Sequence, residues 1–215
     1  AACGSHDGHY AAQYFMDRES TQVRSQQMTS SEFVYAPPKV VGKTSIVVLT
    51  SMRGTKETIE AAKVARELGA VTISQYVDES ELTEVCDYNV KYGSIWEDDK
   101  DQGKTNAGNA LRIAMSIVDI VEGYKYYYEA MEAFAKVQNI YEKAKEYCEP
   151  LAEKWAKEMK NEKVITVLAS GPLYGSGHIF STCNILEMLQ IHSPTFNSCD
   201  FFHGPFAVSY THLRA

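Results

Sequence analysis

Short apolar runs and amphipathic segments alternate along the chain in a regular order. Thr44–Thr50 is a β-branched, nearly continuous apolar run, which is typical of a buried parallel strand. A polar turn follows it, and apolar residues then recur at helical spacing in Glu57–Leu68, with Gly69 as the stop. Val71–Ser74 is predicted to be the next strand. Strand, turn, helix and strand form a βαβ unit, so the pattern predicts an α/β fold with a parallel sheet.

The same order begins again near the end of the chain. Val164–Leu168 is predicted to be a strand, Ala169–Pro172 a turn and Gly177–Ile191 a helix. The first residues, Ala1–Gly4, also read as the end of a strand that enters a glycine turn. We therefore predict two related α/β halves, each with helices on both faces of a parallel sheet in three layers, the second half being cut short.

The remaining segments are predicted to be mainly helical. Apolar positions favour helices over 10–19 and 107–121. The stretch 124–160 is long, helical and rich in Glu, Lys and Tyr, and we expect Pro150 to divide it. The serines at 30–31 are typical of a turn or a helix cap.

These elements suggest where the domains begin and end. We expect a first domain over 1–123, in which the start of the first strand is missing, and a helical connection over 124–160. A second domain is expected to begin within 161–208, and 209–215 follows no earlier pattern, so it is interpreted as a non-native tail. The segment 95–102 is interpreted as a charged connection inside the first domain.

Composition narrows the function classes. The 215 residues carry a net charge of −7 at pH 7, without a basic stripe to neutralise nucleic-acid phosphates. No apolar run is long enough to cross a bilayer, and no signal peptide is visible. Wide spacing without a C-x-x-C pair predicts neither a disulfide framework nor a metal site among the five cysteines, Cys3, Cys86, Cys148, Cys183 and Cys199. Reduced thiols predict a cytoplasmic protein. The acidic charge and the lack of a long apolar run predict no nucleic-acid or membrane partner.

The polar turn after Thr44–Thr50 is a candidate ligand site. In a parallel α/β sheet, ligands bind beyond the carboxyl ends of the strands, where this turn is expected to lie. Backbone N–H groups at the start of the next helix favour a phosphate there. Side chains that would add donors and positive charge are Ser51, Thr55, Thr58, Arg53 and Lys56. The alternative is that the hydroxyls only cap a helix, which Ser and Thr do routinely.

Two ionisable residues near the end of the chain are candidates for proton transfer. Glu187 lies in an otherwise apolar helical stretch, where a carboxylate can act as a proton shuttle or simply be an exposed helix residue. His203 lies in an aromatic loop, where an imidazole can be catalytic or a buried hydrogen-bonding group. Neither residue decides between these alternatives by itself.

Together these residues resemble the sugar isomerase (SIS) domain family. Leu49–Thr58 is similar to its phosphosugar-binding loop, and Phe202–Pro205 is similar to the His-Gly-Pro loop of the isomerase half of glucosamine-fructose-6-phosphate synthase and its deglycase relatives. In those enzymes a catalytic glutamate lies sixteen residues before that histidine, and Glu187 stands sixteen residues before His203. The likeness covers nearly all of the chain up to Phe206 and is strongest to fructoselysine 6-phosphate and related fructosamine deglycases.

The resemblance implies a function and its site residues. Such deglycases convert a fructosamine 6-phosphate into glucose 6-phosphate and a free amino acid or amine, with no metal or organic cofactor. It implies that Glu187 and His203 are catalytic and that a homodimer shares its active sites, one subunit supplying His203 to the other. The implied phosphate-binding residues are Ser51, Met52, Arg53, Gly54, Thr55 and Thr58. Gly4, Ser5, Ser170 and Gly171 are implied to bind the rest of the substrate.

The chain departs from the family pattern at three places. The phosphate loop is one residue shorter than S-x-x-G-x-T-x-E-T, Ser5-His6 stands where Gly-Ser is expected, and Asp200 replaces a usual Glu. Two other functions on the same scaffold remain open. One is an aldose–ketose or aminosugar-phosphate isomerase, and the other is a non-catalytic sugar-phosphate-binding regulator, which the presence of both Glu187 and His203 disfavours.

Overall fold

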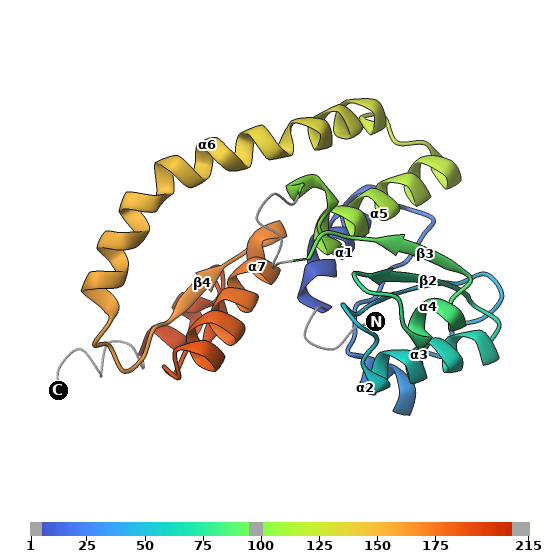
Figure 1. The fold of residues 1–215 in the computed structure, drawn as a ribbon, viewed down its shortest axis with the longest axis horizontal. Helices are drawn as coiled ribbons and strands as arrows, with labels where there is room; N and C mark the ends of the chain where they lie inside the picture. The colour runs from blue at the N-terminus through green and yellow to red at the C-terminus, as the bar shows by residue number, and fades with distance from the viewer. Residues whose placement is uncertain (1–5, 95–100, 208–215) are drawn as a thin grey trace. The chain divides into compact units, whose positions relative to one another are not determined.

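The computed structural model describes residues 6–94 and 101–207 (Figure 1). The chain forms two compact units, Ala1–Tyr141 and Glu142–Ala215, which are described separately below. The expected first turn with Gly4 and Ser5, most of the charged connection 95–102 and the tail 209–215 lie outside the described residues.

The first unit is built on a three-stranded parallel sheet. Its strands are β1 (Ile46–Thr50), β2 (Val71–Tyr76) and β3 (Tyr88–Lys91), and they lie in the order β1-β2-β3. Thr50 lies opposite Gln75 in the register, so β1 and β2 end side by side. The carboxyl ends of the strands therefore meet at one edge, where ligands bind in sheets of this kind.

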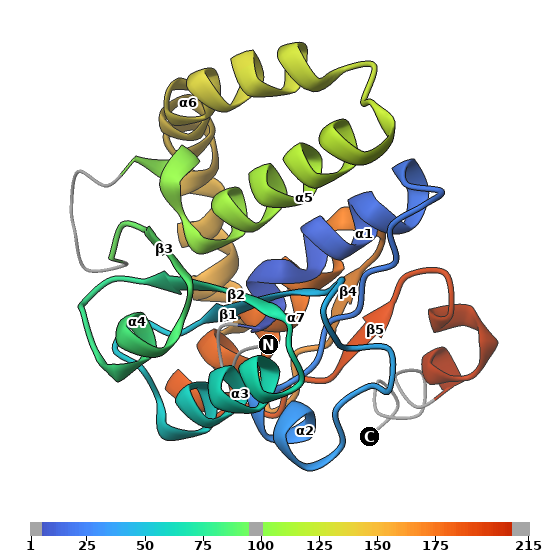
Figure 2. The same ribbon diagram turned by 90° about the vertical axis from the view of Figure 1, so that its right-hand side faces the viewer.

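One face of this sheet is covered by α2 (Ser30–Tyr35), α3 (Lys56–Glu67) and α4 (Glu81–Val85), as Figure 2 shows. The small side chains of α3 let this helix lie close to the strands. The buried apolar residues of this layer are Phe33, Val47, Leu49, Ala61, Ala62, Ala65, Ala70, Leu82 and Cys86. Where the sequence suggested a turn or cap, Thr29 accepts a hydrogen bond from the Glu32 N–H and begins the short helix α2.

The other face carries the short 3-10 helix η1 (His6–His9), α1 (Tyr10–Glu19) and α5 (Asn106–Glu122) (Figure 2). The two α-helices pack through a second group of buried residues, Ala12, Phe15, Met16, Ala110, Ala114 and Val118. The ends of α1 and α5 are joined by the Glu122 carboxylate, which accepts hydrogen bonds from Ser20 and Thr21. A helical layer on each face confirms the predicted three-layer arrangement for this unit.

A long helix, α6 (Tyr127–Met159), leads from the first unit into the second. The expectation that Pro150 divides it is wrong, because the helix continues through this residue. Proline removes one backbone hydrogen bond from a helix. The residues around Pro150 are exposed, so water can satisfy the carbonyl group that loses its partner.

The second unit contains a smaller parallel sheet made of β4 (Val167–Ala169) and β5 (Thr195–Asn197). The predicted strand at 164–168 is confirmed in part, since Val164 forms only an isolated parallel bridge with His192. A turn of 3-10 helix, η3 (Gly171–Leu173), follows β4.

The helix predicted over 177–191 begins earlier and changes type. It starts as α7 (Tyr174–Ile179) and continues as a π-helix, η4 (Phe180–Met188). Gly177 lets α7 approach β4, because a Cβ atom there would lie 2.6 Å from the Cβ of Ala169. The π-helix is held to the sheet by the buried Ser181 hydroxyl, which donates to the carbonyl of Ser193 at 2.7 Å.

The remaining features of the described residues concern cysteines, metal ligands and long apolar helices. Four cysteines, Cys86, Cys148, Cys183 and Cys199, are free thiols. Within 6–94 and 101–207, no group of three or more His, Cys, Asp or Glu side chains is arranged to hold a metal ion. None of the described helices is long and apolar enough to cross a membrane.

Candidate functional site

The loop between β1 and α3 lies at the carboxyl edge of the first sheet. The Ser51 N–H donates to the carbonyl of Gln75 at 3.1 Å, so the loop begins by extending the pairing of β1 with β2. The carbonyl of Met52 accepts the N–H groups of Val77 at 3.1 Å and Asp78 at 3.0 Å. These bonds fix the first two residues of the loop against the segment that follows β2.

The hydroxyl groups predicted to bind a phosphate are brought together at the start of α3. The Ser51 hydroxyl accepts the Thr55 N–H at 2.9 Å, and the Thr55 and Thr58 hydroxyls lie 2.8 Å apart. Thr58 is completely buried, and its hydroxyl also lies 3.0 Å from that of Ser30. Thr55 is the N-cap residue of α3, but its side chain makes no capping hydrogen bond. Simple helix capping by Thr55 therefore does not explain this cluster.

The start of α3 can offer further donors to an anion. The first N–H groups of an α-helix, here at Lys56 and Glu57, have no carbonyl partner within the helix. The helix dipole adds a partial positive charge at the same place. Lys56 is exposed at the first helical position, so its ammonium group can approach a ligand from solvent.

Gly54 and Arg53 shape the outer side of the loop. Gly54 has a φ of +72°, and a Cβ atom there would lie 2.4 Å from the Ser80 hydroxyl, so another residue type would be both strained and crowded. Arg53 is exposed, and its Nε donates to the Asp78 carboxylate at 3.0 Å. An exposed ion pair of this kind is weak in water. A bound anion can therefore compete for the guanidinium group.

Sequence reasoning missed a polar cluster beside this loop, made of His9, Thr50 and Gln75. His9 Nε2 lies 2.6 Å from Thr50 Oγ1 and 3.3 Å from Gln75 Nε2. Thr50 and Gln75 are buried and lie opposite each other at the ends of β1 and β2. Two signals were present in the sequence, a glutamine that continues an apolar strand and a histidine that directly follows Gly8.

In the second unit, Ser170 and Gly171 also follow the carboxyl end of a strand. Ser170 is the N-cap residue of η3, and Gly171 has a φ of +57°. β5 ends beside them, since the Ser198 N–H donates to the carbonyl of Ala169 at 3.0 Å. Both residues therefore stand at the ligand-binding edge of their own sheet.

Glu187 and His203 are both exposed in the second unit. Glu187 lies on the π-helix η4, next to the exposed apolar residues Leu186 and Met188. His203 ends the 3-10 helix η5 (Phe201–His203), which follows β5, and its N–H donates to the carbonyl of Asp200 at 2.9 Å. No hydrogen bond between the two candidate catalytic side chains is present in the described part of the chain.

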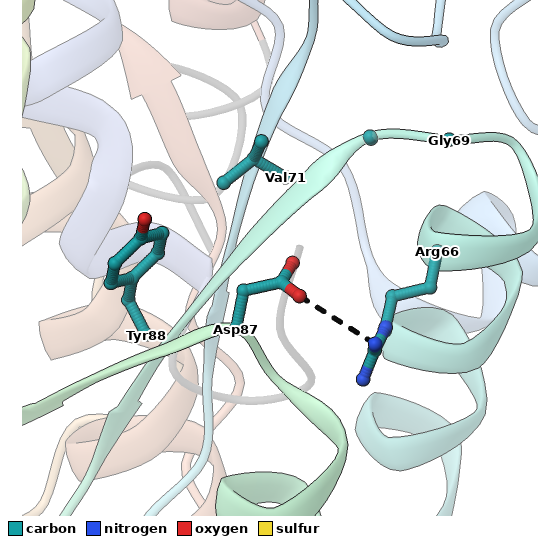
Figure 3. A pocket seen from close by; sticks show the side chains of 6 residues that line it. Arg66, Gly69, Val71, Asp87 and Tyr88 are labelled. Carbon is teal, nitrogen blue, oxygen red and sulfur yellow. Dashed lines mark ion pairs between the residues drawn. The ribbon is translucent and has the colours of Figure 1, made fainter.

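A pocket of about 410 Å³ lies at the opposite edge of the first sheet, where β2 and β3 begin (Figure 3). Its walls come from Arg66, Gly69, Ala70, Val71, Asp87 and Tyr88. The Asp87 carboxylate accepts the Thr72 N–H and hydroxyl and pairs with Arg66 at 3.6 Å. These hydrogen bonds, then the Arg66 charge, lower the pKa of Asp87. Arg66 and Asp87 satisfy each other, and the pocket is at the amino edge, so we do not assign the ligand site there.

Comparison with known proteins gives relatives that match 96% of the chain. No protein-family model matches the chain. The chain is 34% identical to the fructosamine deglycase FrlB of Bacillus subtilis strain 168 over 210 residues, which is 96% of this chain and 63% of FrlB.

Solved structures agree with this likeness. A proposed phosphosugar isomerase from Salmonella typhimurium LT2 matches 96% of the chain with 37% identity and a TM-score of 0.93, and one from Bacillus subtilis matches with 34% identity and a TM-score of 0.91. The C-terminal domain of glucosamine-fructose-6-phosphate aminotransferase from Francisella tularensis shares the fold at 17% identity, with a TM-score of 0.79. The chain spans 63% of the length of the first two proteins.

Proposed function

The chain belongs to the sugar isomerase (SIS) domain family, and we propose that it acts on a phosphorylated sugar, with a fructosamine 6-phosphate as the substrate. The observation that carries this proposal is the loop after β1, where the Ser51, Thr55 and Thr58 hydroxyls gather at the start of α3. A relative that is 34% identical is described as a fructosamine deglycase, which supports this reaction over others of the family.

The phosphate of the substrate is proposed to bind at this loop. Hydroxyl groups and helix N–H groups would donate to its oxygens, and Arg53 and Lys56 would add positive charge. Met52 and Gly54 would contribute their backbone. Gly4, Ser5, Ser170 and Gly171 are proposed to contact the rest of the substrate, since each follows or is predicted to follow a strand end.

The reaction begins with opening of the sugar ring. A fructosamine 6-phosphate is mostly cyclic, and its C2 carbonyl forms when the C2 hydroxyl loses a proton and the ring oxygen gains one. His203 is proposed to move this proton, because an imidazole exchanges protons readily near neutral pH.

The open ketoamine then transfers a proton from C1 to C2. Glu187 is proposed to remove the C1 proton while the C2 carbonyl oxygen gains a proton, which gives an enaminol. It then returns a proton to C2 as the amine nitrogen loses its proton, which gives an imine at C1. Water adds to this imine and the C–N bond breaks, so glucose 6-phosphate and the free amine leave. No external oxidant or reductant is required, because C1 is oxidised to the imine level as C2 is reduced to an alcohol within one molecule.

A homodimer in the cytoplasm is part of the same proposal. Glu187 and His203 are exposed within the second unit, as expected if other parts of the assembled protein complete their surroundings. The free thiols of the described residues fit a reducing compartment. The alternative functions are an aldose–ketose isomerase, which would use the same C1–C2 proton transfer, and a non-catalytic sugar-phosphate binder.

One assay separates the three functions. The protein is incubated with fructoselysine 6-phosphate or with fructose 6-phosphate, and released glucose 6-phosphate and free amine are quantified. A deglycase releases both products in equal amounts from the first substrate. Formation of glucose 6-phosphate only from fructose 6-phosphate would instead identify an isomerase. Binding of both compounds without turnover would identify a regulator.

A further inference from the structure

The His9, Thr50 and Gln75 cluster has no role in the reaction proposed above, although it adjoins the phosphate loop. Thr50 directly precedes Ser51, the first residue of the loop. His9 contacts the Thr50 hydroxyl at 2.6 Å and the Gln75 amide nitrogen at 3.3 Å. The imidazole therefore joins the last residue of β1 to the neighbouring position on β2.

The contacts form a closed ring around the peptide between Thr50 and Ser51. The Gln75 side chain lies against His9, whereas the Gln75 main-chain carbonyl accepts the Ser51 N–H at 3.1 Å. Ser51 in turn accepts the Thr55 N–H through its hydroxyl at 2.9 Å. Through Gln75 and Ser51, these hydrogen bonds connect the His9 ring to Thr55, the residue before α3.

Packing of the core alone does not explain these three polar side chains. Thr50 is 1% exposed and Gln75 is 0% exposed, and Gln75 Oε1 has no hydrogen-bond partner among the residues that the structure describes. A buried polar atom without a partner lowers stability, and apolar side chains of similar size would avoid that loss. Unfilled hydrogen-bonding capacity of this kind calls for an explanation, and the adjoining ligand edge provides one.

We propose that His9 is a positioning residue of the phosphate loop. Its ring fixes the Thr50 hydroxyl and, through Gln75, the peptide that leads into Ser51. The Ser51 hydroxyl and the start of α3 are thereby held in place before an anion arrives, which reduces the ordering required on binding. The choice of ligand, the phosphate group of a phosphorylated sugar, rests on the function proposed above.

Two substitutions at one position test this role. His9→Phe keeps an aromatic ring and removes the contacts of Nε2 with Thr50 and Gln75, whereas His9→Gln keeps a polar group near the position of Nε2. His192→Phe is the matched control, because His192 is exposed in the second unit. For each variant, amide hydrogen exchange is measured without ligand, and inorganic phosphate and glucose 6-phosphate are titrated by calorimetry.

His9→Phe is expected to speed amide exchange at Ser51 and Thr55 by about tenfold, the effect of losing one typical hydrogen bond. Amides in the middle of α3, at Ala62 and Ala65, should keep their exchange rates. The dissociation constants for phosphate and glucose 6-phosphate should both rise by about fivefold to tenfold. His9→Gln should restore most of the affinity, and His192→Phe should change neither measurement.

Unchanged exchange at Ser51 and Thr55 in His9→Phe would overturn the proposal, whatever happens to affinity. Faster exchange across all of α3 would also overturn it, because His9 would then only stabilise the unit. If the unsubstituted protein binds no phosphate but His9→Phe alters exchange locally, the proposed function fails while the coupling of His9 to the loop stands.

Discussion

The two units support their candidate site residues in different ways. In the first unit, the proposed phosphate loop joins β1 and α3, which pack through one group of buried apolar residues, and hydrogen bonds connect the loop to β2 and α3. In the second unit, Ile185 is the only described apolar residue that is buried, and Glu187 and His203 are exposed. Ser51, Ser170 and His203 follow the carboxyl ends of parallel strands, whereas Glu187 lies near the end of the helix between β4 and β5.

The comparison suggests that phosphate binding and proton transfer are supported by different units. The hydrogen bonds that shape the proposed phosphate loop lie within one βαβ unit, so the loop can form within its own unit. Proton transfer to a sugar requires groups that surround the reacting carbons and exclude water. The second unit does not enclose Glu187 in this way by itself, so its chemistry is expected to depend more on the assembled protein.

The largest expected effect is on turnover. Glu187→Gln removes the group that is proposed to carry the proton between C1 and C2, so turnover should fall by about 10²–10⁴-fold while substrate affinity hardly changes. Release of glucose 6-phosphate and calorimetric titration measure the two quantities. Glu162→Gln, at another exposed glutamate of the second unit, is the matched control. Full turnover in Glu187→Gln would contradict the proton-shuttle role.

Shortening a leucine should change the free energy of unfolding differently in the two units. Leu49 is completely buried, so Leu49→Ala should lower the free energy of unfolding by about 2–5 kcal/mol. Leu189 is 61% exposed in the second unit, so Leu189→Ala should change the free energy of unfolding by less than about 0.5 kcal/mol. Urea unfolding followed by circular dichroism measures both. Equal losses would show that Leu189 is covered in solution and would weaken the contrast between the units.

Phosphate binding should depend on the first unit only. Ser51→Ala removes the hydroxyl that accepts the Thr55 N–H, so the dissociation constants for inorganic phosphate and glucose 6-phosphate should rise by about fivefold to tenfold. Ser170→Ala, in the second unit, should leave inorganic phosphate binding unchanged. An equal loss of affinity for an unphosphorylated sugar in Ser51→Ala would place the phosphate elsewhere.

The smallest expected effect concerns the junction of α1 and α5. Hydrogen bonds from Ser20 and Thr21 lower the pKa of Glu122 to about 2, compared with an ordinary value of 4.5. The carboxylate therefore stabilises the fold above pH 4.5, and this contribution is lost as the pH falls from 4.5 towards 2. Glu122→Gln should lower the urea midpoint slightly at pH 7, with a difference that shrinks below pH 4. A difference that stays constant with pH would exclude this origin.

Much of the fold could be predicted because the hydrophobic pattern is strong. The apolar runs at β1 and β2 and the amphipathic stretches at α3 and α5 are long enough to identify, and their ends were placed within a few residues. The elements α4 and β3 were missed. They contain five and four residues, too few to establish a period.

The structure also contains features that hydrophobic periodicity does not predict. A hydrogen bond in a π-helix spans one residue more than in an α-helix, which the hydrophobic pattern does not show. The helix carrying Glu187 was therefore predicted with the wrong type and bounds. Pro150 was expected to divide a helix, but solvent exposure allows the helix to continue through it. His9 and Gln75 meet only because η1 folds across the end of the sheet, and their separation in sequence conceals this contact.

The burial of Cys86 has a consequence for chemical labelling. Burial raises the pKa of the Cys86 thiol to about 11, so almost no thiolate forms at neutral pH. Cys148 and Cys199 are exposed free thiols and are open to alkylating reagents. Because the thiolate is the reactive form, Cys86 should react only when the layer of α3 and α4 separates from the sheet. The rate at which Cys86 is alkylated therefore reports how often the first unit opens.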